Sequence, residues 1–254
     1  MIGVILAAGC ARRLRPLTDN KPKCLLDVGG RTLLQRTVDA MRAAGIREFV
    51  IVTGYRAAML RQHLAEYVGA DIDGEDMLRG QGLTFRFLDN TDYENNNNIY
   101  SLWMAGQVVR GREFLLMDSD ILCDPEAVRR IADSGDDALA LNRHELGEEE
   151  IKIIVDGNGR ILEINKTCDP RQAIGESVGI EHITAAYSTA LYEELESMIL
   201  REGLVNVFYE QAFERLIKRG HTFRIIETTD LFSFEIDTPE DYARAQELIS
   251  QNKL

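Results

Sequence analysis

Short apolar runs rich in β-branched residues alternate with amphipathic helical patterns in the first half of this chain, and this alternation constrains the fold most. We expect strands over residues 2–6, 48–53, 83–88 and 113–117, helices around 34–41 and 56–67, and a Gly- and Asp-rich connection at 69–82. Alternating strands and helices are typical of a mostly parallel sheet that helices cover on both faces. The sequence therefore predicts an α/β fold.

The second half of the chain has a different pattern, which predicts antiparallel strands added to that sheet. We expect strands over residues 138–141, 151–155 and 160–165, helices around 191–199 and 213–217, and a last helix from Pro239 after a Thr238 cap. The last two strands flank Asp156-Gly157-Asn158-Gly159, a strong hairpin signal. No change in composition marks a boundary, so residues 1–254 are expected to form one domain.

The chain is strongly acidic, with 42 Asp and Glu against 29 Lys and Arg and a net charge of −13 over 254 residues. Such a charge disfavours general attraction to nucleic acids or anionic membranes. The four cysteines form no C-x-x-C pair, and no stretch approaches the roughly 18 apolar residues of a membrane span. We expect a cytoplasmic protein that binds no nucleic acid and is not inserted in a membrane. The oligomeric state stays open, with a homodimer among the alternatives.

A basic segment follows the first strand and has the opposite sign to the whole chain. Residues 12–23 contain Arg12, Arg13, Arg15, Lys21 and Lys23 against a single acidic residue, Asp19. The small residues at 7–11 let backbone N–H groups approach a ligand closely. Because ligands of open α/β sheets bind at this edge, the segment predicts a local anion site.

The spacing within this segment matches neither the dinucleotide fingerprint nor the P-loop. In order it contains Leu6-Ala7-Ala8-Gly9, Arg13-Leu14, Pro16-Leu17-Thr18, Pro22-Lys23 and Leu25-Leu26. This series resembles the signature of nucleotidyltransferases that join a nucleoside triphosphate to a phosphorylated acceptor and release pyrophosphate. One departure is Ala11, where that family usually has a second glycine.

The resemblance implies a Rossmann-like fold of the nucleotide-diphospho-sugar transferase type and assigns roles to the segment. Leu6, Ala7, Ala8 and Gly9 would contact the nucleotide. Arg13 would grip the departing β- and γ-phosphates, and Lys23 would neutralise charge on the α-phosphate. Such transfer depends on positioning and electrostatic stabilisation, so cations are the catalytic groups expected here. The alternative is a solvated basic loop.

Two acidic segments are candidates for a magnesium site. Asp118 and Asp120 end the apolar run at 113–117, and the segment 234–241 resembles the closing segment of the same family. The resemblance implies that Asp120 and Asp237 hold Mg²⁺, a hard cation that prefers carboxylates, with Asp118 as a substitute. On its own, Asp237 is equally consistent with an ordinary helix start.

An asparagine run precedes an apolar helix pattern at Asn95-Asn96-Asn97-Asn98-Ile99-Tyr100-Ser101-Leu102. It resembles an element of the bacterial phosphocholine cytidylyltransferase branch. Amides and a hydroxyl at the head of a helix can satisfy the edge of a cytosine, so Asn97, Asn98 and Ser101 are candidate nucleotide-binding residues. The alternative is a polar loop that Asn98 caps.

The acceptor side has weaker signals. Residues 164–166 and 175–180 resemble the acceptor half of that branch, which makes Lys166 and Glu176 candidates, with a surface lysine as the alternative for Lys166. A choline-like or aminoethyl group needs aromatic faces and carboxylates. The candidates for these are Tyr187, Tyr209, Glu210, Phe232, Phe234 and Glu235, with core packing as the alternative for the aromatic ones.

Together these residues favour a Mg²⁺-dependent cytidylyltransferase. It would transfer CMP from CTP to phosphocholine, phosphoethanolamine or an aminoalkylphosphonate. One alternative is a sugar-1-phosphate nucleotidyltransferase that uses UTP or dTTP. A second, of another class, is a catalytically silent nucleotide-sensing protein on the same scaffold.

Overall fold

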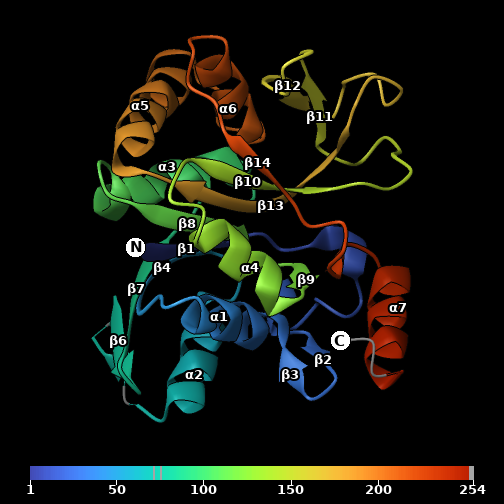
Figure 1. Cartoon of the computed structure of the whole chain (residues 1–254). Helices are drawn as coiled ribbons and strands as arrows, with labels where there is room; N and C mark the ends of the chain where they lie inside the picture. The colour runs from blue at the N-terminus through green and yellow to red at the C-terminus, as the bar shows by residue number, and fades with distance from the viewer. Residues whose placement is uncertain (71, 75, 252–254) are drawn as a thin grey trace.

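The computed structural model describes residues 1–70, 72–74 and 76–251. Its centre is a mixed sheet with the strand order β12-β11-β13-β8-β1-β4-β7-β6-β5, to which β10 and β14 are added beside β13. Helices α1, α2 and α4 cover one face of this sheet, and α3, α5 and α6 cover the other (Figure 1). The expected α/β architecture is confirmed.

The first half of the chain forms the parallel part of the sheet. Its strands are β1 (Ile2–Ala7), β4 (Glu48–Thr53), β7 (Leu83–Asp89) and β8 (Phe114–Asp118). Its helices are α1 (Leu33–Ala43), α2 (Ala57–Val68), α3 (Asn98–Val109) and α4 (Pro125–Ala132). Thr32 caps α1 and forms a capping box with Gln35, which explains where that helix begins. These elements agree with the predicted ones, apart from α4, which the sequence did not predict.

The register of the parallel strands places the basic segment. Leu6 of β1 lies between Val52 of β4 and Asp118 of β8, so all three strands end at the same edge of the sheet. The loop after Ala7 therefore emerges beside the carboxylate of Asp118. This is the edge at which open α/β sheets bind ligands.

The second half of the chain extends the sheet with antiparallel strands. They are β10 (Ala138–Asn142), β11 (Lys152–Val155), β12 (Ile161–Asn165), β13 (Gly175–Ile183) and β14 (Arg224–Glu227). The hairpin between β11 and β12 is confirmed, because their antiparallel pairing closes over residues 156–159. Helices α5 (Ala185–Glu196) and α6 (Glu210–Ile217) follow.

Strand β13 joins the two halves and was not predicted. It pairs antiparallel with β8, β10 and β11, and it is almost entirely buried. Its sequence contains Ser177, Glu181 and His182, which are 3%, 0% and 1% exposed. Polar residues weaken the apolar run that identifies a buried strand, so the pattern concealed it.

Small pairings complete the fold. Strands β2 (Asp27–Val28) and β3 (Arg31–Thr32) form one hairpin, and β9 (Ile121–Cys123) pairs antiparallel with β15 (Ser233–Glu235). The Gly- and Asp-rich connection at 69–82 contains β5 (Ile72–Asp73) and β6 (Met77–Gly80), two short strands that the sequence did not predict; residues 71 and 75 lie outside the described ranges.

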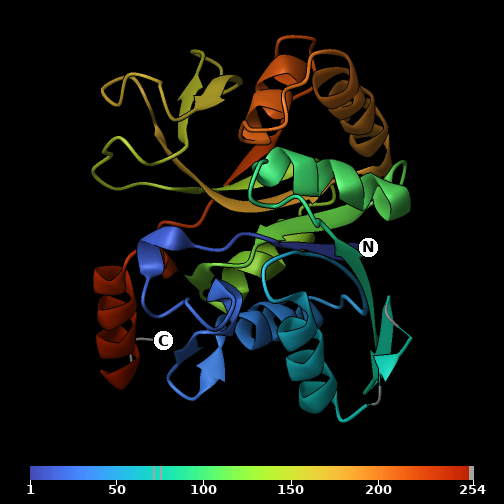
Figure 2. The same ribbon diagram turned by 180° about the vertical axis from the view of Figure 1, so that it is seen from behind.

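The C-terminal segment returns to the basic loop. The β9–β15 pairing and a hydrogen bond from the Ile236 amide to the Asp120 carbonyl (3.2 Å) bring Asp237 beside Asp120. Helix α7 (Pro239–Ser250) then begins after Thr238, which caps it as predicted, and Tyr242 donates to the Asp27 carbonyl at 2.7 Å. Figure 2 shows α7 beside the N-terminal loop region. Within the described residues, no helix is long and apolar enough to cross a bilayer.

Candidate active site

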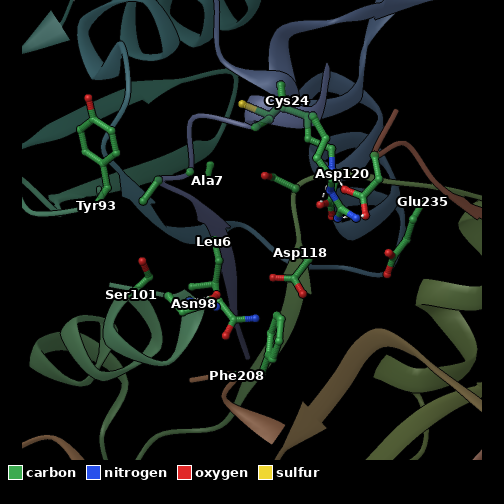
Figure 3. Close-up of a pocket in the computed structure, with 18 of the residues that line it drawn as sticks. Leu6, Ala7, Cys24, Tyr93, Asn98, Ser101, Asp118, Asp120, Phe208 and Glu235 are labelled. Carbon is green, nitrogen blue, oxygen red and sulfur yellow. Dashed lines mark hydrogen bonds and ion pairs between the residues drawn. The ribbon is translucent and has the colours of Figure 1, made fainter. Parts of the chain in front are cut away.

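A cavity of about 380 Å³ opens where β1 and β8 end, which is within the size range of small-molecule sites. Most of the predicted site residues line it: Leu6, Ala7, Ala8, Gly9, Arg13, Lys23, Asn97, Asn98, Ser101, Asp120, Lys166, Glu176, Glu210 and Asp237. In Figure 3, Asn98 and Ser101 lie beside Leu6, and Asp120 lies near Cys24 on another side of the cavity. The structure thus brings together residues from the whole length of the chain.

The loop after β1 is held in a fixed shape by its neighbours. Ala11 has a φ of 44°, in the left-handed region that favours glycine, which is consistent with the glycine usual at this position of the signature. Thr18 Oγ1 donates to the Ala11 carbonyl at 2.9 Å, and the Tyr55 amide donates to the Ala8 carbonyl at 2.9 Å. A Cβ at Gly54 would lie 2.6 Å from the same Ala8 carbonyl oxygen. Only glycine permits this close approach.

Lys23 joins the two predicted metal ligands. Its Nζ lies 2.7 Å from Asp120 Oδ2 and 2.5 Å from Asp237 Oδ1, and its side chain is 10% exposed. Burial acts to lower the pKa of Lys23, but the two carboxylates outweigh it and raise that pKa above its ordinary value. Lys23 is therefore a fully charged cation at the centre of the site.

Arg13 reaches the same carboxylate from the solvent side. Its Nη2 lies 2.7 Å from Asp237 Oδ2, so both oxygens of Asp237 accept from basic side chains. Burial acts to raise the pKa of Asp237, and Lys23 and Arg13 together lower it below its ordinary value. Two cations suited to phosphate and two acids suited to a metal therefore pair with one another.

The donor set of Asp120 and Asp237 would suit a magnesium ion. Asp120 Oδ1 is buried and has no hydrogen-bond partner among the described residues, although Oδ2 accepts from Lys23. The described residues contain no group of three or more acidic, histidine or cysteine ligands. Mg²⁺ often takes one or two carboxylates and completes its shell with water and substrate phosphate. The orphaned oxygen of Asp120, beside Asp237, fits that mode.

Asp118 forms the floor between the two ends of the cavity. Tyr209, fully buried, donates its hydroxyl to Asp118 Oδ2 at 3.2 Å. Burial raises the pKa of Asp118 well above its usual range, and the nearby carboxylates of Asp120 and Glu210 raise it further. Tyr209 was predicted to contact the acceptor; it lies behind the cavity wall and acts on the cavity through Asp118.

The head of α3 presents polar groups with fixed orientations. Asn97 caps the helix by accepting from the Asn98 amide at 2.8 Å, and Asn98 Oδ1 accepts from the Tyr209 amide at 3.0 Å. Asn90, buried and not predicted, donates its Nδ2 to Ser101 Oγ at 3.2 Å. Asn90 follows β7 at the same sheet edge, which is the signal that would have identified it. The helix cap is Asn97 and not Asn98.

The acceptor end agrees only in part with the predictions. Lys166, Glu176 and Glu210 line the cavity, but Tyr187 does not. Tyr187 is 2% exposed and packs against Phe213 and Phe223 in the core, so its assignment to the acceptor was wrong. It lies in the first turn of α5, which faces the sheet. Burial within the core is the ordinary location of such a tyrosine.

Two further acidic residues at or near the cavity were not predicted from the sequence. Glu149 is 73% exposed and bridges Arg13 at 3.4 Å and Lys166 at 3.3 Å. Glu181 of β13 lies beneath the acceptor end, and neither of its carboxyl oxygens has a partner among the described residues. Burial raises the pKa of Glu181 well above its usual range, and Glu210 adds to the effect. Neither residue belongs to a recognisable local motif.

At this sheet edge Lys23 and Arg13 face Asp120 and Asp237. Residues 3–216 match the family model of the MobA-like NTP transferase domain, and the chain belongs to this family. The resemblance to nucleotidyltransferases in the sequence is thereby confirmed.

Similar proteins include several cytidylyltransferases. The chain is 25% identical to the CMP-5'-(3-aminopropyl)phosphonate synthase of Streptomyces rubellomurinus, over 95% of this chain and 38% of that protein. It is 22% identical to the CTP:phosphoglutamine cytidylyltransferase of Campylobacter jejuni, over 89% of this chain and 92% of that protein. The CTP:phosphocholine cytidylyltransferase structure from Streptococcus pneumoniae matches with a TM-score of 0.78 at 20% identity, covering 98% of this chain and 99% of that one.

Proposed function

We propose that this protein transfers CMP from CTP to a small phosphorylated or phosphonate acceptor and releases pyrophosphate. The observation that carries the proposal is the placement of Lys23 between Asp120 and Asp237 at the loop after β1. A solvated basic loop would leave the lysine exposed, whereas this one is buried against two acids. One relative is named for CTP and another for a CMP-phosphonate product, and both names support the choice of nucleotide.

The donors at the head of α3 favour cytosine over uracil. Asn98 Oδ1 already accepts from a backbone amide, so its Nδ2 is the group left to donate, and no described residue accepts from it. Ser101 Oγ accepts from Asn90 and keeps its own hydrogen for donation. Cytosine has two adjacent acceptors, O2 and N3, whereas uracil has a donor at N3. A site with two donors therefore pairs better with cytosine.

Binding of the triphosphate would exchange partners within the charged cluster. Arg13 and Lys23 would leave carboxylate oxygens and hold phosphate oxygens, which keeps their charge neutralised in both states. Asp120 and Asp237 would then be free to hold Mg²⁺, which would offset the charge of the phosphates. The cluster is thus already arranged for the substrate before it binds.

The transfer itself needs orientation more than a proton acceptor. An oxygen of the acceptor phosphate or phosphonate, already ionised at neutral pH, forms a bond to the α-phosphorus of CTP. The bond between that phosphorus and the bridging oxygen breaks, and its electrons leave with pyrophosphate. Lys23 stabilises the charge on the α-phosphate, and Arg13 stabilises the leaving pyrophosphate.

The acceptor end supports an acceptor with a cationic head group. Lys166 can hold its phosphate or phosphonate, and Glu176 and Glu210 line the same cavity. Phosphocholine, phosphoethanolamine and aminoalkylphosphonates all have this combination of anion and cation. The test is pyrophosphate release with CTP, UTP, dTTP and GTP, each against these acceptors and several sugar 1-phosphates, with Mg²⁺ present.

The outcomes of this panel separate the alternatives. Release that requires CTP and an aminoalkyl or choline acceptor supports the proposal. Release with UTP or dTTP and a sugar 1-phosphate would replace it with a sugar-nucleotide synthesis. CTP binding without release across the whole panel would favour a nucleotide sensor.

A further inference from the structure

The acceptor end of the cavity contains a buried carboxylate that lacks a hydrogen-bond donor. Glu210, the first residue of α6, lines the cavity and is 5% exposed. Its Oε2 is buried without a partner among the described residues. Leaving such an oxygen unpaired is costly, so the site is incomplete without a donor.

The basic side chains near Glu210 form ion pairs with other acidic residues. Lys23 pairs with Asp120 and Asp237, while Lys166 pairs with Glu149 at 3.3 Å and stands 4.7 Å from the centre of the Phe208 ring. Burial raises the pKa of Glu210 to about 7, with its own backbone and Lys166 opposing the shift. A cationic donor from a ligand would satisfy the free oxygen and favour the ionised form.

The lining of the cavity is acidic and has few aromatic surfaces. Asp118, Glu176 and Glu235 also line the cavity, and the aromatic residues among the described lining are Phe208 and Tyr93. Figure 3 shows Phe208 near Asp118, with Tyr93 at a distance across the cavity. The tyrosines expected to form aromatic faces lie in the core, and Phe234 faces a neighbouring cavity, with Arg244 at 5.1 Å from its ring.

This arrangement distinguishes two kinds of cationic head group. A quaternary ammonium has no N–H, so it leaves the Glu210 oxygen unpaired, and it binds best within several aromatic faces. A primary ammonium has three N–H donors and can bond to several carboxylates at once. The carboxylates, one with an unpaired oxygen, and the single nearby aromatic ring of Phe208 fit a primary ammonium group better than a quaternary one.

We propose that the acceptor carries a primary ammonium group on a short alkyl chain, and that Glu210 selects it by accepting a hydrogen bond. The acceptor is then an ω-aminoalkyl phosphate or phosphonate, with its anion at Lys166 and its ammonium at Glu210. This inference rests on the proposed function, because it concerns the acceptor of the same reaction. It makes Glu210 the residue that determines specificity.

The first test uses the unaltered protein and a series of acceptors. Pyrophosphate release with CTP and Mg²⁺ is measured for phosphoethanolamine, its N-methyl and N,N-dimethyl derivatives, and phosphocholine, and for 2-aminoethylphosphonate. We expect kcat/KM to fall with each methyl group, by at least about 100-fold across the series. Equal or higher kcat/KM for phosphocholine would overturn the inference while leaving the proposed function intact. No release with any acceptor would instead reject the proposed function.

The second test changes the selecting residue. In Glu210→Gln we expect KM for the primary-amine acceptor to rise at least about tenfold, the dependence on methylation to weaken, and the affinity for CTP to stay unchanged. Glu193→Gln makes the same chemical change on an exposed position of α5 and should alter neither quantity. An unchanged preference among the methylated acceptors in Glu210→Gln would contradict the role of Glu210. Should that variant not fold, the acceptor series decides alone.

Discussion

The two ends of the cavity are built in different ways. The nucleotide end comes from the loop after β1 and the head of α3, two continuous segments in which neighbouring residues share one task. The acceptor end comes from β13, the start of α6 and Lys166, where single residues from distant segments meet. Continuous segments leave a pattern in the sequence, whereas isolated residues do not. This difference explains why nearly all residues predicted for the nucleotide line the cavity, whereas only some of those predicted for the acceptor do.

The charges at the two ends also differ in a way that assigns their ligands. At the nucleotide end, Arg13 and Lys23 are paired with acids that a metal can take over. At the proposed acceptor end, Glu210 Oε2 has no hydrogen-bond partner among the described residues, which favours a ligand with a positive charge. In the proposed function, one end would take an anion with its metal and the other a cation.

Removal of Lys23 should have the largest effect on activity. In Lys23→Ala the α-phosphate loses its buried cation, and we expect kcat for pyrophosphate release to fall about 100- to 1000-fold, or about 3–4 kcal/mol of barrier. Because Asp120 and Asp237 would also lose their partner, the thermal midpoint Tm is measured in parallel. Turnover within tenfold of the parent protein would rule out the assigned role.

Asp237 tests whether the acids hold the metal. In Asp237→Asn we expect the Mg²⁺ concentration for half-maximal activity to rise at least about tenfold, since one charged ligand is lost. A titration of Mg²⁺ at saturating CTP measures it. Glu240→Gln, three residues further along at the start of α7, is a matched control. The same Mg²⁺ dependence in Asp237→Asn as in the parent would reject the metal site.

Asn98 tests the selection of the base. In Asn98→Ala one of the two donors is lost, so the ratio of kcat/KM for CTP over UTP should drop about tenfold, which corresponds to about 1.4 kcal/mol. Competition between the two nucleotides in one reaction gives this ratio directly. A ratio that does not move would show that the base is recognised elsewhere in the cavity.

Glu181 provides the smallest effect, on the pH dependence of stability. The pKa of Glu181 is raised in the folded protein. When the pH exceeds about 4.3, the ordinary pKa of a glutamate, the unfolded chain releases the proton of Glu181 while the native state retains it. The stability contributed by Glu181 is therefore present at low pH and lost as pH rises. The Gln side chain of Glu181→Gln cannot ionise. As the pH rises from about 5 to about 8, we therefore expect the Tm of this variant to rise relative to the Tm of the parent. The relative rise should be about 2–4 °C for each kcal/mol of stability that the parent loses. Thermal scans across this range measure the difference, and a difference that stays constant with pH would contradict this environment for Glu181.

Much of the fold could be predicted because its signals are local. The strands of the parallel part are continuous apolar runs, and caps such as Thr32 and Thr238 mark helix starts within a few residues. Strand β13 was not predicted because Glu181 and His182 are polar, although the elements packed on both sheet faces bury them. No property of those residues alone indicates that they are buried.

The sequence by itself determined the parallel part of the sheet and the basic loop after β1 with its cations, because each is encoded within one short stretch of chain. Only the tertiary structure decided that Asp237 lies beside Lys23, that Tyr187 is a core residue and that no described residue donates to Glu210 Oε2. Each of these depends on residues far apart in the chain. Burial and pairing are properties of the packed molecule, so the chemistry of the acceptor end follows from the fold rather than from any motif.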